Sequence, residues 1–187
     1  LPQEKIESLA RWKAKVGENE AERVRNEAAT RGTLMHSFLE YYVRGEKLLD
    51  TTDEGKVAGD MGQVIIDQGL KDMEEVWGSE VTLYYPGLYA GATDVVGMYA
   101  GKPAIIDFKQ TNKPKQREWI EDYFVQCAAY ACMLYEMKGL IVKKFVIIMT
   151  CENGEVEIYE EYDKKKYINL LGKYIAEFIE FKLQEYA

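Results

Sequence analysis

The 187-residue sequence has no long apolar run and only three cysteines, the residues whose disulfides stabilise small secreted domains. Its longest apolar stretch, near Phe145, has the length of a strand and falls far below the roughly 18 residues of a membrane-spanning helix. The first residues contain no apolar signal segment, and the chain does not begin with Met, so we expect a processed or trimmed protein. Three cysteines without a CxxC pair argue against a disulfide framework or a closed zinc site, and fit a reducing compartment. We therefore expect a cytoplasmic protein with no membrane partner.

An excess of positive charge is also missing. The chain has 24 Lys and Arg against 32 Asp and Glu, a net charge of −8. Such a chain does not coat nucleic acid non-specifically, and composition alone argues against nucleic acid as a partner. The segment 102–117 is an exception, because it contains five basic residues and one acid. Its polar loop after residue 109 is suited to contact phosphates, although a solvated loop would have the same composition.

Hydrophobic spacing predicts a single α/β domain over residues 1–187, with a helical part over 1–77 and a βββαββα core over 78–187. We expect helices over residues 2–15, 18–30, 33–44, 57–77 and 119–138, and a last helix after Asp163. We expect strands over residues 80–85, 89–99, 104–109, 145–151 and 156–161. Thr33 is the expected N-cap of the third helix, and Asn153-Gly154 predicts a tight turn between the last two strands.

Two aspartates lie inside neighbouring apolar strands. Asp107 and Lys109 share one face of their strand because side chains alternate along it, and Asp94 lies in the preceding strand. Carboxylates on neighbouring strands suit a hard divalent ion such as Mg²⁺. A lysine beside them can orient or deprotonate a water, or stabilise charge that grows on a phosphate. A salt-bridged pair at a sheet edge would explain the same pattern, but burying unpaired carboxylates is costly, which favours a site.

Two helices carry polar pairs one turn apart. His36, which is the only histidine, shares a helix face with Glu40, and that face could supply an imidazole to the same metal. A lone helical histidine is also often a packed or a surface residue. Gln126 and Tyr130 share a face of the helix that follows the Asp107 strand. Taken alone, this second pair fits an ordinary helix with a core tyrosine.

Together, four motifs resemble the PD-(D/E)XK nuclease superfamily, and within it the RecB-like branch that includes the mitochondrial genome maintenance exonuclease and phage exonucleases. The motifs are Arg31-Gly-Thr-x-x-His36, Gly91-x-x-Asp94, Ile106-Asp107-x-Lys109 and Gln126-x-x-x-Tyr130. Their order matches the family, and the spacing of 13 residues between the two aspartates is typical of the branch. The resemblance covers about residues 31–131. It implies a restriction-endonuclease-like core with a mixed central β-sheet flanked by helices, preceded by an N-terminal helical region.

The resemblance also implies roles for individual residues. His36, Asp94 and Asp107 look like ligands of Mg²⁺ or Mn²⁺, with the Phe108 carbonyl as a fourth ligand, and Lys109 looks like the catalytic lysine beside the two aspartates. Gln126 and Tyr130 resemble the helix motif that supports the site and contacts DNA, and Arg31 could reach a phosphate. The basic charge of the loop after residue 109 adds Lys113, Lys115 and Arg117 as expected DNA contacts. Glu80 and Glu40 are possible additional acids. All three cysteines lie in the second half of the chain, so we expect no iron–sulfur cluster of the kind that some relatives bind.

These implications define the expected function. The chain should be a metal-dependent DNA exonuclease that hydrolyses phosphodiester bonds, with a preference for single-stranded DNA or free ends. We expect a monomer in the cytoplasm, that of a bacterial host if the protein is phage-encoded. A structure-specific endonuclease of the same superfamily and a non-catalytic nucleic-acid-binding module on a nuclease fold remain alternatives, as does RNA as the substrate.

Overall fold

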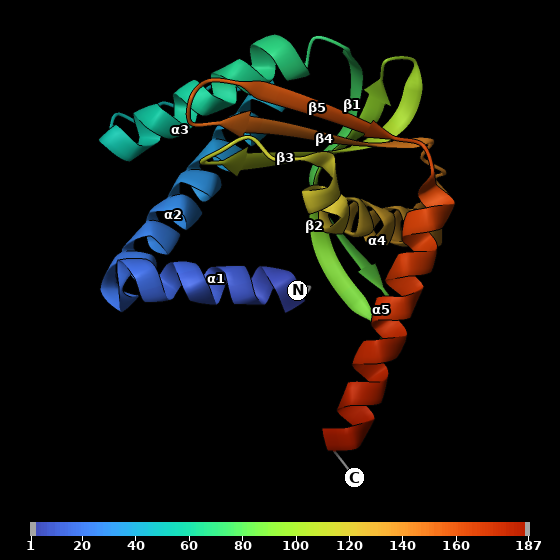
Figure 1. Ribbon diagram of the computed structural model, residues 1–187. Helices are drawn as coiled ribbons and strands as arrows, with labels where there is room; N and C mark the ends of the chain where they lie inside the picture. The colour runs from blue at the N-terminus through green and yellow to red at the C-terminus, as the bar shows by residue number, and fades with distance from the viewer. Residues whose placement is uncertain (1–2, 186–187) are drawn as a thin grey trace.

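A five-stranded mixed sheet with helices on both faces forms the centre of the molecule (Figure 1). The computed structural model describes residues 3–185. The strands are β1 (Met73–Tyr85), β2 (Tyr89–Tyr99), β3 (Lys102–Thr111), β4 (Lys144–Cys151) and β5 (Val156–Glu161), and they lie in this order across the sheet. All neighbours are antiparallel except β3 and β4, which are parallel. The α/β fold with a restriction-endonuclease-like core and an N-terminal helical region is therefore confirmed.

The helices are α1 (Gln3–Val16), α2 (Glu18–Val43), α3 (Asp53–Val64), α4 (Glu121–Lys138) and α5 (Lys164–Glu185). A π turn, η1 (Ile65–Gly69), continues α3, and a 3₁₀ turn, η2 (Arg117–Ile120), precedes α4. A parallel pair of strands needs a long crossover, and α4 supplies it between β3 and β4. Every residue of β4 is buried, as expected for a strand covered on both faces.

Two apolar cores lie on opposite faces of the sheet. One core joins α4 and the start of α5 to the sheet through residues such as Phe124, Tyr167 and Ile105. The other joins α2 and α3 to the sheet through residues such as Met35 and Ile106. Successive residues of β3 therefore enter different cores, which is the consequence of the alternating side chains of a strand.

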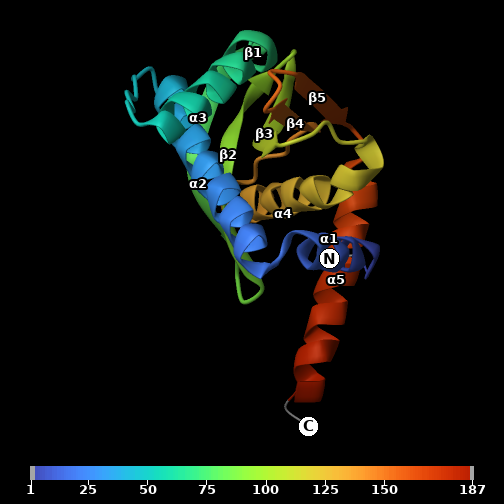
Figure 2. The same cartoon turned by 60° about the vertical axis from the view of Figure 1, so that its left-hand side comes forward.

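The two end helices project from this body (Figures 1 and 2). Gly17 separates α1 from α2 and has a φ of 89°, a conformation that glycine adopts readily. Of the described residues of α5, only Tyr167 is buried, and Phe178 is 59% exposed. No helix within residues 3–185 is long and apolar enough to span a membrane.

Two expected helix boundaries are wrong. Thr33 is not an N-cap, because α2 runs unbroken from Glu18 to Val43, and the Thr33 hydroxyl instead donates to the carbonyl of Ala29 one turn earlier. The helix expected over 57–77 ends in the π turn, and its last residues form the start of β1. Pro2, expected in the first turn of α1, lies outside the described residues.

Candidate active site

The two strands that carry the aspartates separate next to them. The last paired residues of β2 and β3 are Val95 and Ile106. Asp94 and Asp107 come next on each strand, directly beyond this pair. We call this point the fork and define it by these four residues. The separation frees backbone groups that a continuous ladder would have used, and it leaves room for side chains from both faces of the sheet.

Glu80 extends the row of acids onto β1. The pairs on either side of it keep β1 and β2 in register, so Glu80 lies opposite Asp94. Its φ of 50° is uncommon for a residue other than glycine and is of the kind found at functional sites. Burial raises the pKa of Glu80, and the negative charges of Asp94 and Glu40 raise it further. The structure thus places Glu80, which was expected as a possible additional acid, beside Asp94.

His36 reaches the fork from α2. Its Nδ1 lies 2.8 Å from the carbonyl oxygen of Gly32, and its Nε2 lies 3.0 Å from the carbonyl oxygen of Phe108 and 3.3 Å from Oδ2 of Asp94. Burial alone would lower the pKa of His36, but the hydrogen bond and charge of Asp94, with the Gly32 carbonyl, raise it to about 9. Without a metal this raised pKa favours the charged ring, whereas a bound metal would require the neutral imidazole.

The backbone of Phe108 joins the two strands across the fork. Its N–H donates to Oδ2 of Asp94 at 2.6 Å, and its carbonyl accepts from His36. Both groups face the gap that opens where β2 leaves β3. The carbonyl that the family resemblance implied as a ligand thus lies beside the Asp94 carboxylate and the His36 imidazole.

Asp107 and Lys109 form a buried pair on β3. Asp107 is 2% exposed, and its Oδ2 lies 2.6 Å from Nζ of Lys109. This contact is an ion pair rather than a well-aligned hydrogen bond, because Oδ2 has no hydrogen-bond partner of good geometry. Burial raises the pKa of Asp107, Lys109 opposes the rise, and the charge of Asp94 adds to it.

The charge state of Lys109 decides what it can do. Burial alone would lower the pKa of its amine, but the charge of Asp107 outweighs burial and raises the pKa above its usual value. Lys109 is therefore a cation at neutral pH. A cation can orient a water or balance charge on a phosphate, whereas it cannot accept a proton as a base.

Helix α4 holds Lys109 from the other face of the sheet. Oε1 of Gln126 accepts from Nζ of Lys109 at 3.1 Å, and Nε2 of Gln126 donates to the hydroxyl of Tyr130 at 2.6 Å. A Cβ at Gly91 would lie 3.1 Å from the ring of Tyr130, so glycine at this position lets the ring pack against β2. The two predicted α4 residues thus support the lysine through one chain of hydrogen bonds.

Acidic partners already hold two of the arginines that were expected to contact DNA. Arg31 bonds to Gln110 at 2.8 Å and forms an ion pair with Glu152. Arg117 forms an ion pair with Glu161 and is only partly exposed. These guanidinium groups fasten α2 and the loop after β3 to the body of the protein, so much of their charge is balanced internally.

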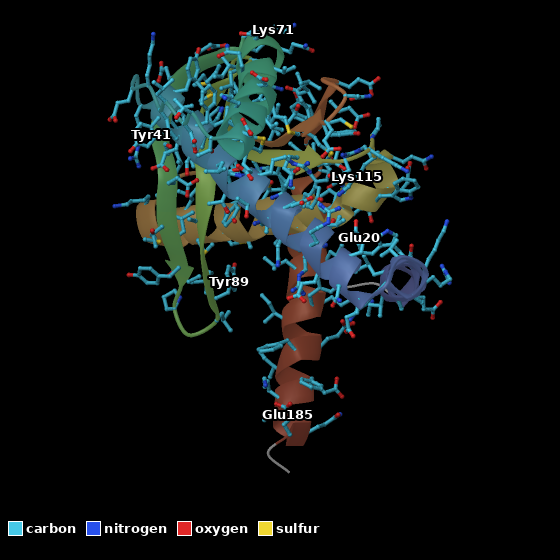
Figure 3. All side chains as sticks on the ribbon, turned by 90° about the vertical axis from the view of Figure 1, so that its left-hand side faces the viewer. Glu20, Tyr41, Lys71, Tyr89, Lys115 and Glu185 are labelled. Atoms are coloured by element: carbon cyan, nitrogen blue, oxygen red, sulfur yellow. The ribbon has the colours of Figure 1, made fainter. Side chains whose placement is uncertain are left out.

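The loop lysines differ from the two arginines. Lys113 is exposed, whereas Lys115 is half-buried and donates to the hydroxyl of Tyr123 at 2.7 Å. Figure 3 shows Lys115 on the side of the molecule where α4 begins, away from Tyr41 and Lys71. Tyr123 was missed by the sequence reasoning, which considered only the Gln126 and Tyr130 face of α4. Its position three residues before Gln126, on a neighbouring part of the same helix, was the available signal.

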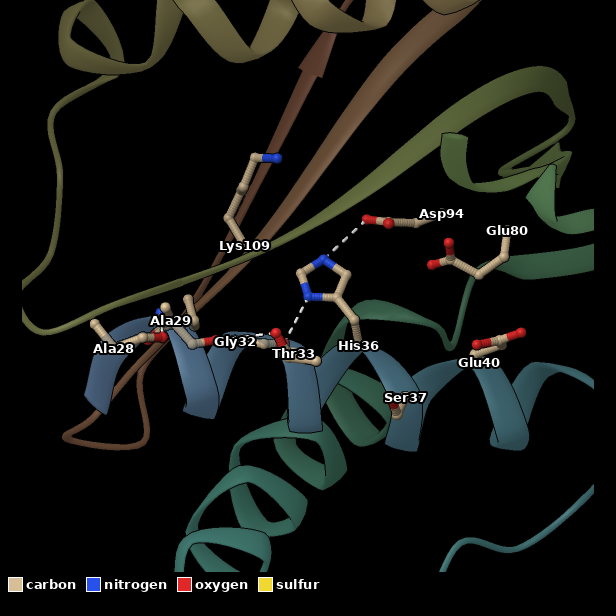
Figure 4. Close-up of a pocket in the computed structure, with 11 residues that line it drawn as sticks. Ala28, Ala29, Gly32, Thr33, His36, Ser37, Glu40, Glu80, Asp94 and Lys109 are labelled. Carbon is tan, nitrogen blue, oxygen red and sulfur yellow. Dashed lines mark hydrogen bonds and ion pairs between the residues drawn. The ribbon is translucent and has the colours of Figure 1, made fainter. Parts of the chain in front are cut away.

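An open cleft of about 570 Å³ adjoins the fork between α2 and the sheet. Figure 4 shows His36 and Glu40 from α2 on one side of it, with Asp94 and Glu80 opposite. Small residues form much of the α2 wall: Ala28, Ala29, Gly32, Thr33 and Ser37. Glu40 is held by an ion pair with Arg44 one turn later. The predicted residues His36, Glu40, Glu80, Asp94 and Lys109 all line this cleft.

The donors at the fork fit a hard divalent cation. Within residues 3–185, no three His, Cys, Asp or Glu side chains come together as a ready metal centre. The Asp94 carboxylate and the Phe108 carbonyl supply two oxygens of the kind that Mg²⁺ and Mn²⁺ accept. The His36 imidazole lies beside them and would add a nitrogen ligand only after it loses a proton. Asp107 adds a buried carboxylate next to these groups, and its Oδ2 already lies 2.6 Å from the Lys109 ammonium.

The fold is similar to that of a known structure. A presumed exonuclease from Eubacterium rectale aligns with a TM-score of 0.51 at 13% identity, over 82% of this chain. The chain spans 66% of that protein's length, and at this identity the likeness establishes a shared, nuclease-like fold alone. A second solved protein, named SSO0001, gives a TM-score of 0.39 at 13% identity over 78% of this chain and 84% of its own, too low to carry an argument. No protein-family model and no curated protein matches the chain.

Proposed function

We propose that this protein is a metal-dependent deoxyribonuclease of the RecB-like PD-(D/E)XK branch, acting as an exonuclease on single-stranded DNA or free ends. The observation that carries the proposal is the arrangement at the fork. Asp94 and Asp107 follow the last β2–β3 pair, His36 reaches Asp94 from α2, and the Lys109 cation lies against Asp107. The nuclease-like fold of the Eubacterium rectale protein supports the proposal at the level of architecture.

The proposed chemistry follows from the residue types. Mg²⁺ or Mn²⁺, when held by His36, Asp94, Asp107 and the Phe108 carbonyl, would supply Lewis acidity toward the scissile phosphate and lower the pKa of a bound water. The chain's own residues do the rest. Lys109 orients the attacking water and balances the negative charge that develops on the phosphate, and Gln126 keeps its amine in place.

The preference for single strands or ends is the finer part of the proposal. The cleft beside the fork lies between α2 and the sheet, and α2 forms one of its walls. An unpaired strand can enter such a cleft more readily than the middle of a duplex. We also propose that the protein acts as a monomer.

The deciding experiment is cleavage of end-labelled single- and double-stranded DNA, with a covalently closed circle alongside, in Mg²⁺, in Mn²⁺ and in EDTA. The proposal predicts metal-dependent release of short products from labelled ends and no loss of the closed circle. Cleavage of the circle would favour an endonuclease, and labelled RNA in the same assay tests the other substrate.

The Asp107→Ala variant is the control for contaminating nucleases, purified in the same way and checked for folding by circular dichroism. We expect it to keep the fold and lose cleavage, because a proposed metal ligand is gone. Cleavage that persists in EDTA, or in folded Asp107→Ala protein, would overturn the proposal.

A further inference from the structure

The aromatic ring of Tyr123 lies between two lysines of different origin. Nζ of Lys109, from the fork, lies 4.9 Å from the ring centre, and Nζ of Lys115, from the loop after β3, lies 5.2 Å from it. Aromatic faces attract cations, so one ring helps to hold both ammonium groups. Because both distances are measured to one ring centre, the two groups are at most about 10 Å apart.

The hydroxyl of Tyr123 has capacity to bind a further group. It accepts a hydrogen bond from Nζ of Lys115 at 2.7 Å. A phenol that accepts in this way still has its own proton to donate, and a lysine ammonium has three protons to donate. The pair therefore offers two or more donors and a positive charge, which together suit an anion with several acceptor oxygens.

Lys115 is held in place rather than free in solvent. Its carbonyl accepts from the hydroxyl of Tyr159 at 2.8 Å, which fixes the loop to β5. Within the part of the chain that the structure describes, no carboxylate forms an ion pair with Lys115. Arg31 and Arg117 differ in this respect, because each is balanced by a glutamate. Lys115 thus keeps its charge available in an otherwise acidic protein.

We infer that Lys115 and Tyr123 form a binding subsite for one backbone phosphate of the substrate strand, next to the phosphate that occupies the fork. The inference rests on the proposed function, since the ligand is a nucleic-acid strand. The separation of at most about 10 Å between the two amines corresponds to no more than about three steps of 3.4 Å along one strand of B-form DNA, so both amines can contact phosphates of the same strand. The strand would then pass from the fork toward the start of α4.

The test measures binding without cleavage. A fluorescein-labelled oligothymidylate is titrated with protein in EDTA at several KCl concentrations, and the slope of log K against log salt is compared. Removing one phosphate contact from a single strand should reduce the magnitude of the slope by about 0.7, so we expect this change for Lys115→Gln. Lys71→Gln is the matched control, because Lys71 is exposed and lies far from Lys115 (Figure 3). An unchanged slope in Lys115→Gln, or an equal change in Lys71→Gln, would overturn the subsite.

A second variant tests whether the two side chains act as one unit. Tyr123→Phe keeps the ring that holds Lys109 and removes only the hydroxyl, and we expect it to weaken binding roughly twofold to tenfold. In the double variant with Lys115→Gln, the loss should be smaller than the product of the two single losses. Strictly multiplicative losses would mean two separate contacts and would reject a shared subsite.

Neutral linkages in the oligonucleotide locate the phosphate. A series in which one methylphosphonate replaces each phosphate in turn should contain one position that weakens binding to the wild-type protein but not to Lys115→Gln. The outcomes are separable from those of the proposed function. Failure of the wild-type protein to bind in EDTA, or binding that does not depend on Lys115, rejects the subsite alone, whereas the cleavage assay in Mg²⁺ or Mn²⁺ tests the proposed function.

Discussion

The two faces of the sheet bring different chemistry to the fork. From the α2 face comes His36, which meets the carboxylate of Asp94. From the α4 face come neutral and cationic groups, with Gln126 on the amine of Lys109 and Tyr123 beside it. The α2 face therefore adds a group suited to a metal, and the α4 face positions a group suited to an anion, while the two carboxylates lie on the strands between them. The comparison teaches that a phosphate at the fork would lie between its metal and its lysine, with each supplied by a separate layer of the fold.

The largest expected effect comes from removing the cation of the α4 side. Lys109→Gln should slow DNA cleavage by about 10²–10³-fold, the range for loss of one preorganised electrostatic group. It should not weaken Mn²⁺ binding, because the ligands proposed for the metal are all kept. Single-turnover cleavage and a Mn²⁺ titration followed by electron paramagnetic resonance measure the two effects. A weaker affinity for Mn²⁺ in Lys109→Gln would show that Lys109 also contributes to metal binding, and would contradict the assignment of separate roles to the two faces.

The opposite change removes the imidazole of the α2 side. His36→Asn should lower the affinity for Mn²⁺ by about 10–100-fold, at least the loss typical of disturbing groups around a metal. Cleavage should recover as the Mn²⁺ concentration is raised, since Lys109 and both aspartates are intact. The midpoint of a Mn²⁺ activation curve measures this. A midpoint equal to that of the wild-type protein would show that His36 is a packed residue and no ligand.

A third change loosens the attachment of α2 to the sheet. The Arg31 side chain is 13% exposed and bonds to Gln110 and Glu152. We expect Arg31→Gln to lower the free energy of unfolding by about 1–2 kcal/mol, because the part-buried Gln110 loses a charged donor and Glu152 loses its ion pair. Urea denaturation followed by circular dichroism measures the change. Arg25→Gln is the control, since its ion pair with Glu22 is exposed and should contribute less than about 1 kcal/mol.

The smallest effect is expected from replacing Gln126, whose side chain supports Lys109. Gln126→Leu removes one hydrogen bond to Lys109, which keeps its ion pair with Asp107. A loss of about 1 kcal/mol corresponds to about fivefold slower cleavage, with unchanged affinity for Mn²⁺. Tyr130→Phe, which removes only the hydroxyl that accepts from Gln126, should have a smaller effect still. A loss beyond about 100-fold in Gln126→Leu would instead indicate direct contact with the substrate.

Much of the fold follows from local sequence. The β2 strand begins and ends where the pattern predicted it, and the turn at Asn153-Gly154 joins β4 and β5 as expected. The errors arise where tertiary contacts override local preference. Gly69 packs within reach of Ile148, and its carbonyl accepts from the hydroxyl of Tyr99, so the helical spacing after α3 does not continue. No local pattern reveals these partners, because they lie far away in the sequence.

The sequence also predicts one part of the candidate site and misses another. The strand pattern and the family motifs together anticipated that Asp94, Asp107 and Lys109 would lie near one another, and that His36 would face them. The sequence could not reveal that Glu152 would neutralise Arg31, or that Tyr123 would contact two lysines. Charge counts treat every basic residue of the loop alike. The structure separates Arg117, which is paired with Glu161, from Lys115, whose amine bonds to Tyr123 and has no carboxylate partner among residues 3–185.

The two-residue turn between β2 and β3 has a consequence for how this protein can vary. Ala100 and Gly101 both have positive φ, as a tight hairpin turn of type I′ requires, and they set the pairing that ends at the fork. An extra residue between Lys102 and Asp107 would rotate the carboxylate and the lysine into the core beneath α2 and α3. A longer turn keeps this register, whereas a single insertion in this short stretch would bury both charges and remove the site. The number of residues between the hairpin turn and Asp107 therefore determines on which face of the sheet Asp107 and Lys109 lie.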